Sequence, residues 1–207
     1  MGSKCCAPDN NTDRLMDKAY RRILWIVLII NFSMFVVEIV AGLAAGSVAL
    51  QADALDFLAD SANYAISLFV VGMALRRRAQ AALIKGITMA LFGLWVIGNT
   101  GWHIFYGDIP DAMTMGAVGT AALISNAIVL ALLWAYRYGD SNMRSVWICS
   151  RNDVVGNLAV LLAALGVFGT GTAWPDIIVA TVMACLALQG AVVIIKQAYG
   201  EIKMSKT

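Results

Sequence analysis

The stretch Ser47–Asn63, SVALQADALDFLADSAN, decides the fold, because it is an apolar sequence that carries three carboxylates. At about 100° per helical residue, Asp56 and Asp60 lie roughly 40° apart, and Asp53 falls within about 60° of both. All three therefore project from one face of a helix. The apolar run around them is long enough to cross a bilayer, where each carboxylate costs at least about 2.5–3.5 kcal/mol on insertion scales. Three such groups on one face need a partner, and for an anionic cluster the natural partner is a cation.

The composition of the whole chain is that of an integral membrane protein. Of its 207 residues, 60% are hydrophobic and only 14% are charged, whereas a soluble domain carries nearer a quarter of charged residues. Neither polar end of the chain is long enough to bury a core of its own. We therefore expect a cytoplasmic N-terminal tail (1–22), one six-helix transmembrane domain (23–197) and a short cytoplasmic C-terminal tail (198–207).

Six apolar segments reach the length of about 20 residues that a membrane-spanning helix needs. Lys and Arg gather in one set of connecting segments, and the opposite loops, around 43–46, 106–111 and 169–176, contain none. By the positive-inside rule, this asymmetry places both termini in the cytoplasm. The sequence therefore predicts an all-α integral membrane protein, a bundle of six transmembrane helices with both termini cytoplasmic. The predicted spans are 23–45, 46–74, 80–103, 112–136, 146–168 and 175–197.

A second group of candidate ligands lies in the fifth predicted span. Cys149, Asp153 and Asn157 follow one another at i, i+4 and i+8, so they share one helix face within roughly 80°. The second and fifth spans thus each offer a pair of ligands at i, i+4, a spacing that puts Cβ atoms about 5–6 Å apart. If Asp56 and Asp60 face the pair formed by Cys149 and Asp153, the protein offers four ligands, the number that zinc favours.

Each of these candidates also has a simpler interpretation. Asp56 and Asp60 could form a proton relay or an interhelical salt bridge to Arg151, although one arginine cannot neutralise so many carboxylates. Cys149 could be a small buried hydrophobe. As a ligand, its thiolate would favour soft ions such as zinc and cadmium over magnesium, calcium or manganese. Asp53 is expected to support the site, as an outer ligand, a proton acceptor or a hydrogen-bonding group between helices.

Other polar residues at membrane depth receive supporting or structural roles. Asn157 is expected either to orient the ligands or to pack between helices. Glu38 and Asn31 could lie on the ion path, but we favour bonds to neighbouring helices. His103, the only histidine, falls at the outer membrane edge and is expected to be interfacial. Cys185 is expected in the core.

The chain resembles the cation diffusion facilitators over roughly residues 23–197, nearly the whole membrane part. The run 31–60, which contains Glu38, Gly42 and the sequence ALQADALDFLAD, looks like the first two helices of that family. The family's second helix carries a His or Asp, three residues and then an Asp, which matches Asp56 and Asp60. The family's fifth helix usually reads His-x-x-x-Asp. Here CSRNDVVGNLAV (149–160) matches that Asp and has a cysteine in place of the histidine. Further matches are Arg78-Ala79-Gln80, Asn126 and Trp174-Pro175-Asp176.

This resemblance implies a proton-coupled exporter of divalent heavy-metal cations such as zinc, cadmium and cobalt, located in the inner or plasma membrane. It implies an intramembrane acidic metal site on the second and fifth helices, and makes 23–197 a transport domain. No permanently bound cofactor is expected, because the divalent cation, zinc first among the candidates, is exchanged for protons. The implied ligands are Asp56, Asp60, Cys149 and Asp153, with Asp53 and Asn157 in support.

The partners implied are the divalent metal ion, protons and the lipid bilayer. A second copy of the chain is a further partner if helix packing alone can form a homodimer. No nucleic acid is expected.

The C-terminal cytoplasmic domain of many family members has no counterpart here, so we expect a short form. The alternatives are a non-transporting metal-binding subunit or sensor of the same fold, and a proton-coupled carrier of another cation. An enzyme is not expected, because the sequence offers no Ser/His/Asp or Cys/His constellation. The adjacent Cys5 and Cys6 could capture a soft metal or belong to an unstructured tail.

Overall fold

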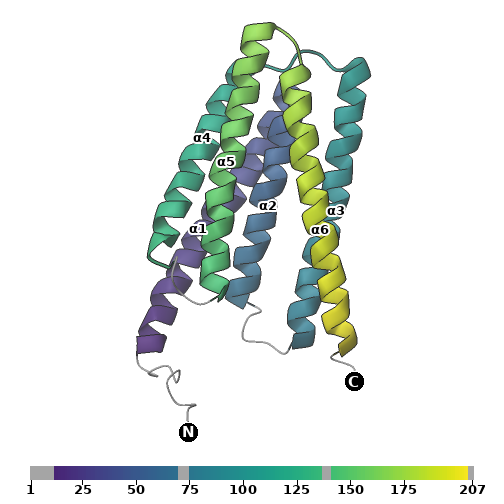
Figure 1. Ribbon diagram of the computed structural model, residues 1–207. Coiled ribbons are helices and arrows are strands. Elements are labelled where there is room, and N and C mark those ends of the chain that lie inside the picture. The colour runs from purple at the N-terminus through teal and green to yellow at the C-terminus, as the bar shows by residue number, and fades with distance from the viewer. Residues whose placement is uncertain (1–11, 70–74, 137–140, 205–207) are drawn as a thin grey trace.

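Six long helices run side by side in the computed structural model (Figure 1). The structure describes residues 12–69, 75–136 and 141–204; within these, only the backbone is described for 12–17, 75, 78, 136 and 141–152. All regular structure in these ranges is helical, as predicted. The elements are α1 (Thr12–Ala45), α2 (Val48–Phe69), α3 (Leu75–Tyr106), α4 (Ala112–Leu133), the short 3₁₀ helix η1 (Trp134–Tyr136), α5 (Ser141–Thr170) and α6 (Trp174–Met204).

The helices are longer than most of the predicted spans. α1 begins at Thr12 rather than at 23, and α6 continues to Met204 rather than ending at 197. The reason is that backbone hydrogen bonding continues beyond the apolar part of a helix, whereas hydropathy detects only that part. α1 begins and α6 ends at the same end of the bundle (Figure 1). Which side of the membrane this end faces stays a prediction.

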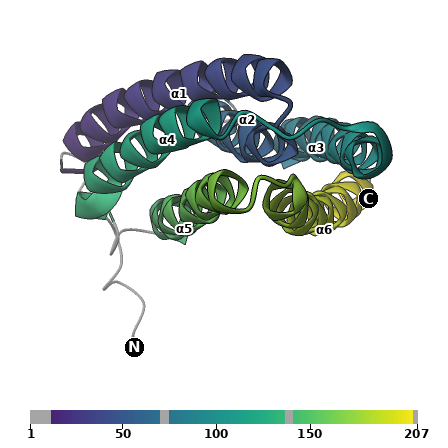
Figure 2. The ribbon, with the colours of Figure 1, turned by 90° about the horizontal axis from the view of Figure 1, so that it is seen from above.

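Five of the six helices, all except α2, are long and apolar enough to cross a membrane. α2 has 22 residues, or about 33 Å at 1.5 Å per residue, which matches the roughly 30 Å of a bilayer core. Its aspartates lower its hydropathy. The helix is compatible with a membrane because it packs against α1, α3, α5 and α6, which surround it with protein. Figures 1 and 2 show α3 and α6 on one side of α2, and α1, α4 and α5 on the other.

The surface of the bundle is apolar and its interior is partly polar, the reverse of a soluble protein. Ile29 is 61% exposed, Leu91 65% and Leu162 67%, as expected for side chains that face lipid. Cys185 is also exposed, so the prediction that it lies in the core is wrong; the α6 face that carries it points outward. The buried polar residues are Asn31, Glu38, Ser47, Gln51, Asp53, Asp60, Ser61, Thr100, Asn126, Asn157 and Asp176.

The start of α2 is fixed at the end of the bundle away from the termini. Gly46 has a φ of +65°, a left-handed conformation that glycine adopts without steric cost, and it reverses the chain between α1 and α2. Ser47 then caps α2, since its Oγ accepts from the Leu50 N–H at 3.1 Å. The carboxylate of Asp176 in the first turn of α6 accepts from Ser47 Oγ at 2.6 Å and from the N–H groups of Val48 and Ala49 at 2.9 and 3.1 Å.

Asp111 plays the corresponding role for α4. Its side chain accepts from the Met113 N–H at 3.1 Å and from Thr114 Oγ1 at 2.5 Å. These bonds, first of all the one from Thr114, hold the pKa of the exposed Asp111 carboxyl below its usual range. Its own N–H donates to the Ala45 carbonyl at 3.0 Å. This bond ties the α3–α4 connection to the α1–α2 turn. The position of α2 along the bundle is therefore fixed both by Asp176 of α6 and by the α3–α4 connection.

Candidate metal site

The carboxyl groups of Asp60 in α2 and Asp153 in α5 meet inside the bundle. They lie within hydrogen-bonding range of each other, so α2 and α5 face one another at this depth, a relation that the spacing alone did not determine. Asp60 is 7% exposed and also accepts a hydrogen bond from the Tyr64 hydroxyl at 3.3 Å. One oxygen of Asp153, Oδ2, is buried with no hydrogen-bond partner among the described residues. A buried carboxylate oxygen in this state can accept a cation or a proton.

Asp56 lies one turn before Asp60 on α2 and belongs to the same cluster of negative charge, because its carboxyl group is close enough to interact with those of Asp53, Asp60 and Asp153. Among the side chains that the structure describes, no three His, Cys, Asp or Glu side chains are already arranged as a metal-binding group. The predicted carboxylate ligands are therefore neighbours, but they do not converge on one point.

The fourth predicted ligand, Cys149, is placed only by its backbone. It belongs to α5 and precedes Asp153 by one turn, but its side chain lies outside the described residues. The same holds for Arg151, so the alternative of a salt bridge from Arg151 to the aspartates is not tested. Cys5 and Cys6 lie outside the described ranges altogether.

Asp53 faces a different set of partners from Asp56 and Asp60. Asn157 of α5 donates its amide nitrogen to both Asp53 carboxylate oxygens, at 3.3 and 3.1 Å. The carbonyl oxygen of Asn157 in turn accepts from the amide of Asn126 in α4 at 3.0 Å. Asp53, Asn126 and Asn157 are each at most 3% exposed. The two residues predicted to support the site are thus directly bonded to each other.

Glu38 completes this polar cluster from α1. Its side chain is fully buried, and its carboxyl group lies beside that of Asp53. The sequence favoured a structural role for Glu38 and did not connect it with Asp53. Four helices, α1, α2, α4 and α5, therefore contribute to one buried network, which lies about one turn from Asp56 and about two turns from Asp60 along α2.

Sequence reasoning missed Lys85, which lies in α3 near the site. Its ammonium group donates a hydrogen bond to Oδ1 of Asn63 in α2, and its positive charge acts on the Asp60 carboxyl group. A single charge in the apolar sequence AALIKGITMA was the available signal. It was overlooked because Lys85 lies close to the basic segment 76–78, which the positive-inside rule explains.

A second missed contact lies toward the other end of α2. Gln51, which is 1% exposed, donates to the Gly42 carbonyl at 3.3 Å and accepts from the Asn99 amide in α3 at 2.5 Å. The backbone carbonyl of Asn99 also lies 2.9 Å from Nδ1 of His103, one turn later in α3. His103 is thus partly buried near the end of α3 and is bonded within its own helix.

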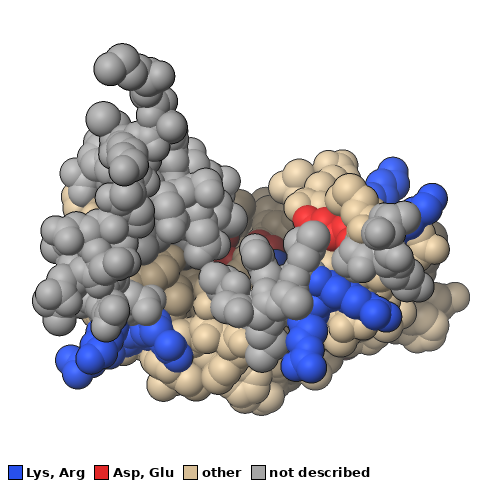
Figure 3. Space-filling model, turned by 90° about the horizontal axis from the view of Figure 1, so that it is seen from below, with Lys and Arg blue, Asp and Glu red and all other residues tan. Residues whose placement is uncertain are grey.

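The end of the bundle that holds the beginning of α1 and the end of α6 is rimmed by basic side chains. Figure 3 shows Lys and Arg around this face, with acidic side chains both at the surface and recessed between them. The charges come from the start of α1, the start of α3 and the last turns of α6. They are Lys18, Arg21, Arg22, Arg76, Arg77, Lys196 and Lys203. The arrangement matches the charge asymmetry from which the orientation was predicted.

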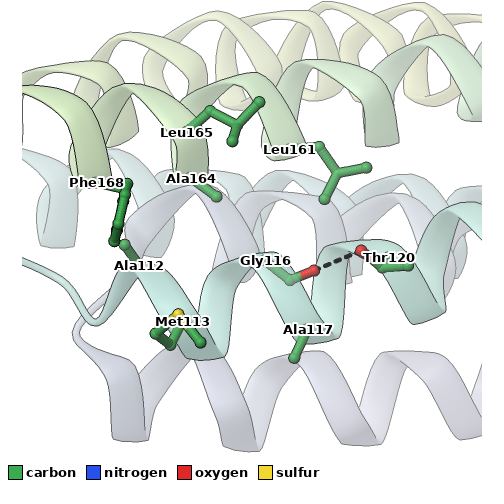
Figure 4. Close-up of a pocket in the computed structure, with 9 residues that line it drawn as sticks. All are labelled: Ala112, Met113, Gly116, Ala117, Thr120, Leu161, Ala164, Leu165 and Phe168. Atoms are coloured by element: carbon green, nitrogen blue, oxygen red, sulfur yellow. Dashed lines mark hydrogen bonds between the residues drawn. The ribbon is translucent and has the colours of Figure 1, made fainter.

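The structure also has a groove of about 600 Å³ between α4 and α5, shown in Figure 4. Its lining is apolar apart from Thr120, whose hydroxyl is bonded to the Gly116 carbonyl at 2.7 Å. Two of the residues that line it, Met113 and Phe168, are each 74% exposed. The groove therefore belongs to the outer apolar surface, and none of the acidic residues lines it.

Curated proteins of known function resemble this chain at low identity. The "Cadmium, cobalt and zinc/H(+)-K(+) antiporter" of Bacillus velezensis is 24% identical over 184 residues, which cover 79% of this chain and 58% of that protein. The "Zinc transporter ZitB" of Pectobacterium atrosepticum is 27% identical over 194 residues, covering 84% and 58%. The "Metal cation efflux system protein CzcD" of Cupriavidus metallidurans is 25% identical over 187 residues, covering 84% and 59%. The chain thus spans about three fifths of the length of these relatives.

The family described as "Cation efflux transmembrane domain" matches residues 24–206, which is nearly the whole helical bundle. The relatives are transporters and not enzymes, and with five membrane-capable helices the chain is a multi-pass protein of the inner or plasma membrane. The resemblance drawn from the run 31–60 and from Asp153 is confirmed, and the chain belongs to the cation efflux family, the cation diffusion facilitators.

Proposed function

We propose that this protein is a proton-coupled exporter of divalent heavy-metal cations, with zinc as the first candidate and cadmium and cobalt next. The observation that carries the proposal is the meeting of Asp60 and Asp153 from two different helices inside an otherwise apolar bundle. Two carboxylates in this position repel each other unless a cation or a proton lies between them. The names of the relatives, which refer to zinc, cadmium and cobalt, support a metal as that cation.

The proposed ligands are the carboxylates of Asp56, Asp60 and Asp153 and the thiolate of Cys149. All are compatible with zinc, which takes oxygen and sulfur ligands in a tetrahedral arrangement. The carboxylates need only small side-chain rotations to converge, because Asp56 and Asp60 are one turn apart on the same helix. Asp53 stays outside this set, because Asn157 already occupies both of its oxygens.

The proposed mechanism follows from linkage between metal and protons. Metal ligands must be deprotonated, so a metal that binds displaces protons from the site. Protons that return from the other side of the membrane then weaken the affinity for the metal and drive its release. We place the basic rim and both termini in the cytoplasm, in accordance with the positive-inside rule. Access would alternate by movement of the α3–α6 pair relative to the other helices around a roughly fixed site.

The test is metal uptake into proteoliposomes across a pH gradient, with Zn²⁺, Cd²⁺, Co²⁺ and Mn²⁺ compared. We expect flux of Zn²⁺ and Cd²⁺ that depends on the gradient and is abolished by Asp153→Asn. Asp108→Asn, which removes an exposed carboxylate, is the matched control and should leave the flux unchanged. If no ion is transported, the exporter proposal fails. Binding without flux would favour a metal-binding subunit or sensor.

The role of Cys149 has its own test. If Cys149 is a ligand, Cys149→Ser replaces a soft thiolate by a hard hydroxyl and should reduce Cd²⁺ transport more than Zn²⁺ transport. Cys149→His should keep Zn²⁺ transport, because imidazole is a good zinc ligand. Unchanged selectivity and affinity in both variants would show that Cys149 is a packing residue, without affecting the carboxylate ligands.

A further inference from the structure

Glu38 is a fully buried carboxyl group that no donor of the described side chains reaches. Its side chain is 0% exposed, and both of its oxygens lack a partner among the described residues. The polar group at hydrogen-bonding range is the carboxyl group of Asp53. A carboxylate accepts hydrogen bonds but does not donate them. The contact between Glu38 and Asp53 is therefore favourable only if one of the two carries a proton.

The surrounding hydrogen bonds determine which of the two carboxyl groups is protonated. Asn157 offers its amide nitrogen to both oxygens of Asp53. In the same orientation, the carbonyl oxygen of Asn157 accepts from the Asn126 amide. Asp53 is thus the acceptor for the Asn157 amide nitrogen. The proton of the pair therefore belongs on Glu38, whose O–H donates to Asp53.

Among the described side chains, the charges that face this pair are all negative. Asp56, on the same helix as Asp53, interacts with Glu38, and Asp153 of α5 interacts with Asp53. α4, which packs against α1, has no titratable residue between Ala112 and Leu133. The nearest described cation of α3, Lys85, acts on Asp60. Loss of the proton therefore requires a positive charge to arrive nearby, and the metal of the proposed function would supply it.

We propose that Glu38 and Asp53 form a proton-binding site that is separate from the metal ligands. This inference rests on the proposed function. Along α2, Asp53 precedes Asp56 by about 4.5 Å and Asp60 by about 10.5 Å, toward the α1–α2 turn and away from the basic rim. A proton that enters from that side reaches the pair before it reaches the metal ligands.

The exchange at this site is a simple proton transfer. When a divalent cation binds at Asp56, Asp60 and Asp153, its charge stabilises the ionised form of Glu38. The O–H bond of Glu38 breaks, and the proton passes to water on the side of the α1–α2 turn. When the cation leaves toward that side, hydronium returns a proton to the Glu38 carboxylate. One proton is therefore exchanged per transport cycle without occupying a metal ligand.

The proton can be detected by infrared spectroscopy on the full chain in lipid nanodiscs, without any metal. The C=O stretching band of a protonated carboxyl group should be lost in part in Glu38→Gln and retained in the control Asp108→Asn. Glu38→Gln has nearly the same volume and can donate its amide to Asp53, so the network is kept. In Asp53→Asn, Glu38 keeps its proton but changes its acceptor, so the band should shift rather than disappear. An unchanged band in both Glu38→Gln and Asp53→Asn would overturn the proposal.

The exchange is tested by adding Zn²⁺ to the same samples and counting the protons released. The wild type should release about one proton more per bound Zn²⁺ than Glu38→Gln, as expected for a group whose ionisation is linked to metal binding. Equal release would show that the Glu38 proton is permanent, and would overturn this inference while metal transport still stands. If the infrared result holds but no divalent metal is bound or transported by the wild type, the proposed function fails instead.

Discussion

The amide nitrogen of Asn157 in α5 lies 3.1 and 3.3 Å from the two carboxylate oxygens of Asp53 in α2. This bond joins the two helices that carry the proposed metal ligands, about one turn from Asp56 and Asp153 and about two turns from Asp60. It separates Asp53 from the other aspartates of α2, because a carboxylate with a fixed donor has less need of a cation. The face of α2 that carries the three aspartates therefore contains residues with two different roles.

We predict that Asn157→Ala destabilises the bundle by about 1–3 kcal/mol, the cost of leaving a buried polar group without its partner. Both Asp53 and Asn126 lose their bonding partner in this variant. The measurement is thermal unfolding in detergent, monitored by circular dichroism. Leu158→Ala, next to it on α5 but 45% exposed toward lipid, is the control and should change stability much less. Equal effects of the two substitutions would argue against the network.

The lysine near the site leads to a second prediction. The charge of Lys85 acts on Asp60, so it competes electrostatically with a cation bound there. Lys85→Gln keeps a donor for Asn63 and removes the charge. We expect the variant to bind Zn²⁺ roughly three- to tenfold more tightly, equivalent to about 0.7–1.4 kcal/mol. Isothermal titration calorimetry measures this directly.

Lys196→Gln is the matched control for Lys85→Gln, since Lys196 is an exposed residue of α6. It should leave zinc affinity unchanged. Weaker binding in Lys85→Gln would contradict the electrostatic argument and would show that the ammonium group is needed to hold Asn63 or Asp60 in place.

Much of this architecture could be predicted from the sequence, because membrane proteins obey strong local rules. The helices follow from hydropathy, and two i, i+4 patterns made Asp60 and Asp153 candidate ligands. That their helices lie together was implied by the family resemblance. The role of these residues as metal ligands stays a prediction. The aspartates of α2 lower its hydropathy, so this helix falls outside the five that are apolar enough to cross a membrane by composition.

The remaining features depend on contacts between distant segments, which no local pattern encodes. The family resemblance includes Asp176 beside Pro175. The bonds of Asp176, however, join α6 to the start of α2, between residues 127 to 129 positions apart in the sequence. Glu38 is a single acid in α1, and only the packing of α1 on α2 places it beside Asp53. Residues of this kind pair one helix with another, and their partners are fixed by the tertiary structure.

Asp176 gives a third prediction. Its carboxylate is 1% exposed and binds the first N–H groups of α2, where a negative charge also interacts favourably with the helix dipole. We expect Asp176→Ala to lower stability by about 2–3 kcal/mol, the range for buried hydrogen bonds to a charged group. Hydrogen exchange should show faster exchange of the Val48 and Ala49 amides. Ser47→Ala keeps the carboxylate on these amides and should protect them better; the reverse order would contradict the assignment.

A fourth prediction concerns the close contact between α3 and α6. Gly86 has no side chain, and a Cβ atom there would lie 2.8 Å from Cγ1 of Ile195 and 3.1 Å from Cγ2 of Ile194. Gly98, on the same helix, would accept a Cβ with no neighbouring atom within 4 Å. Small residues at helix contacts allow this kind of close approach in membranes. The two glycines therefore respond differently to the same substitution.

We expect Gly86→Ala to destabilise the protein by about 1–3 kcal/mol through overpacking, and Gly98→Ala to stabilise it by up to about 1 kcal/mol through helix propensity. Ile195→Ala should cost stability alone but restore part of it in combination with Gly86→Ala, because it removes the atom that the new methyl group would meet. Thermal unfolding of the four variants in one detergent measures these differences. If the double variant is no more stable than the sum of the single effects predicts, the loss in Gly86→Ala does not come from the α3–α6 contact.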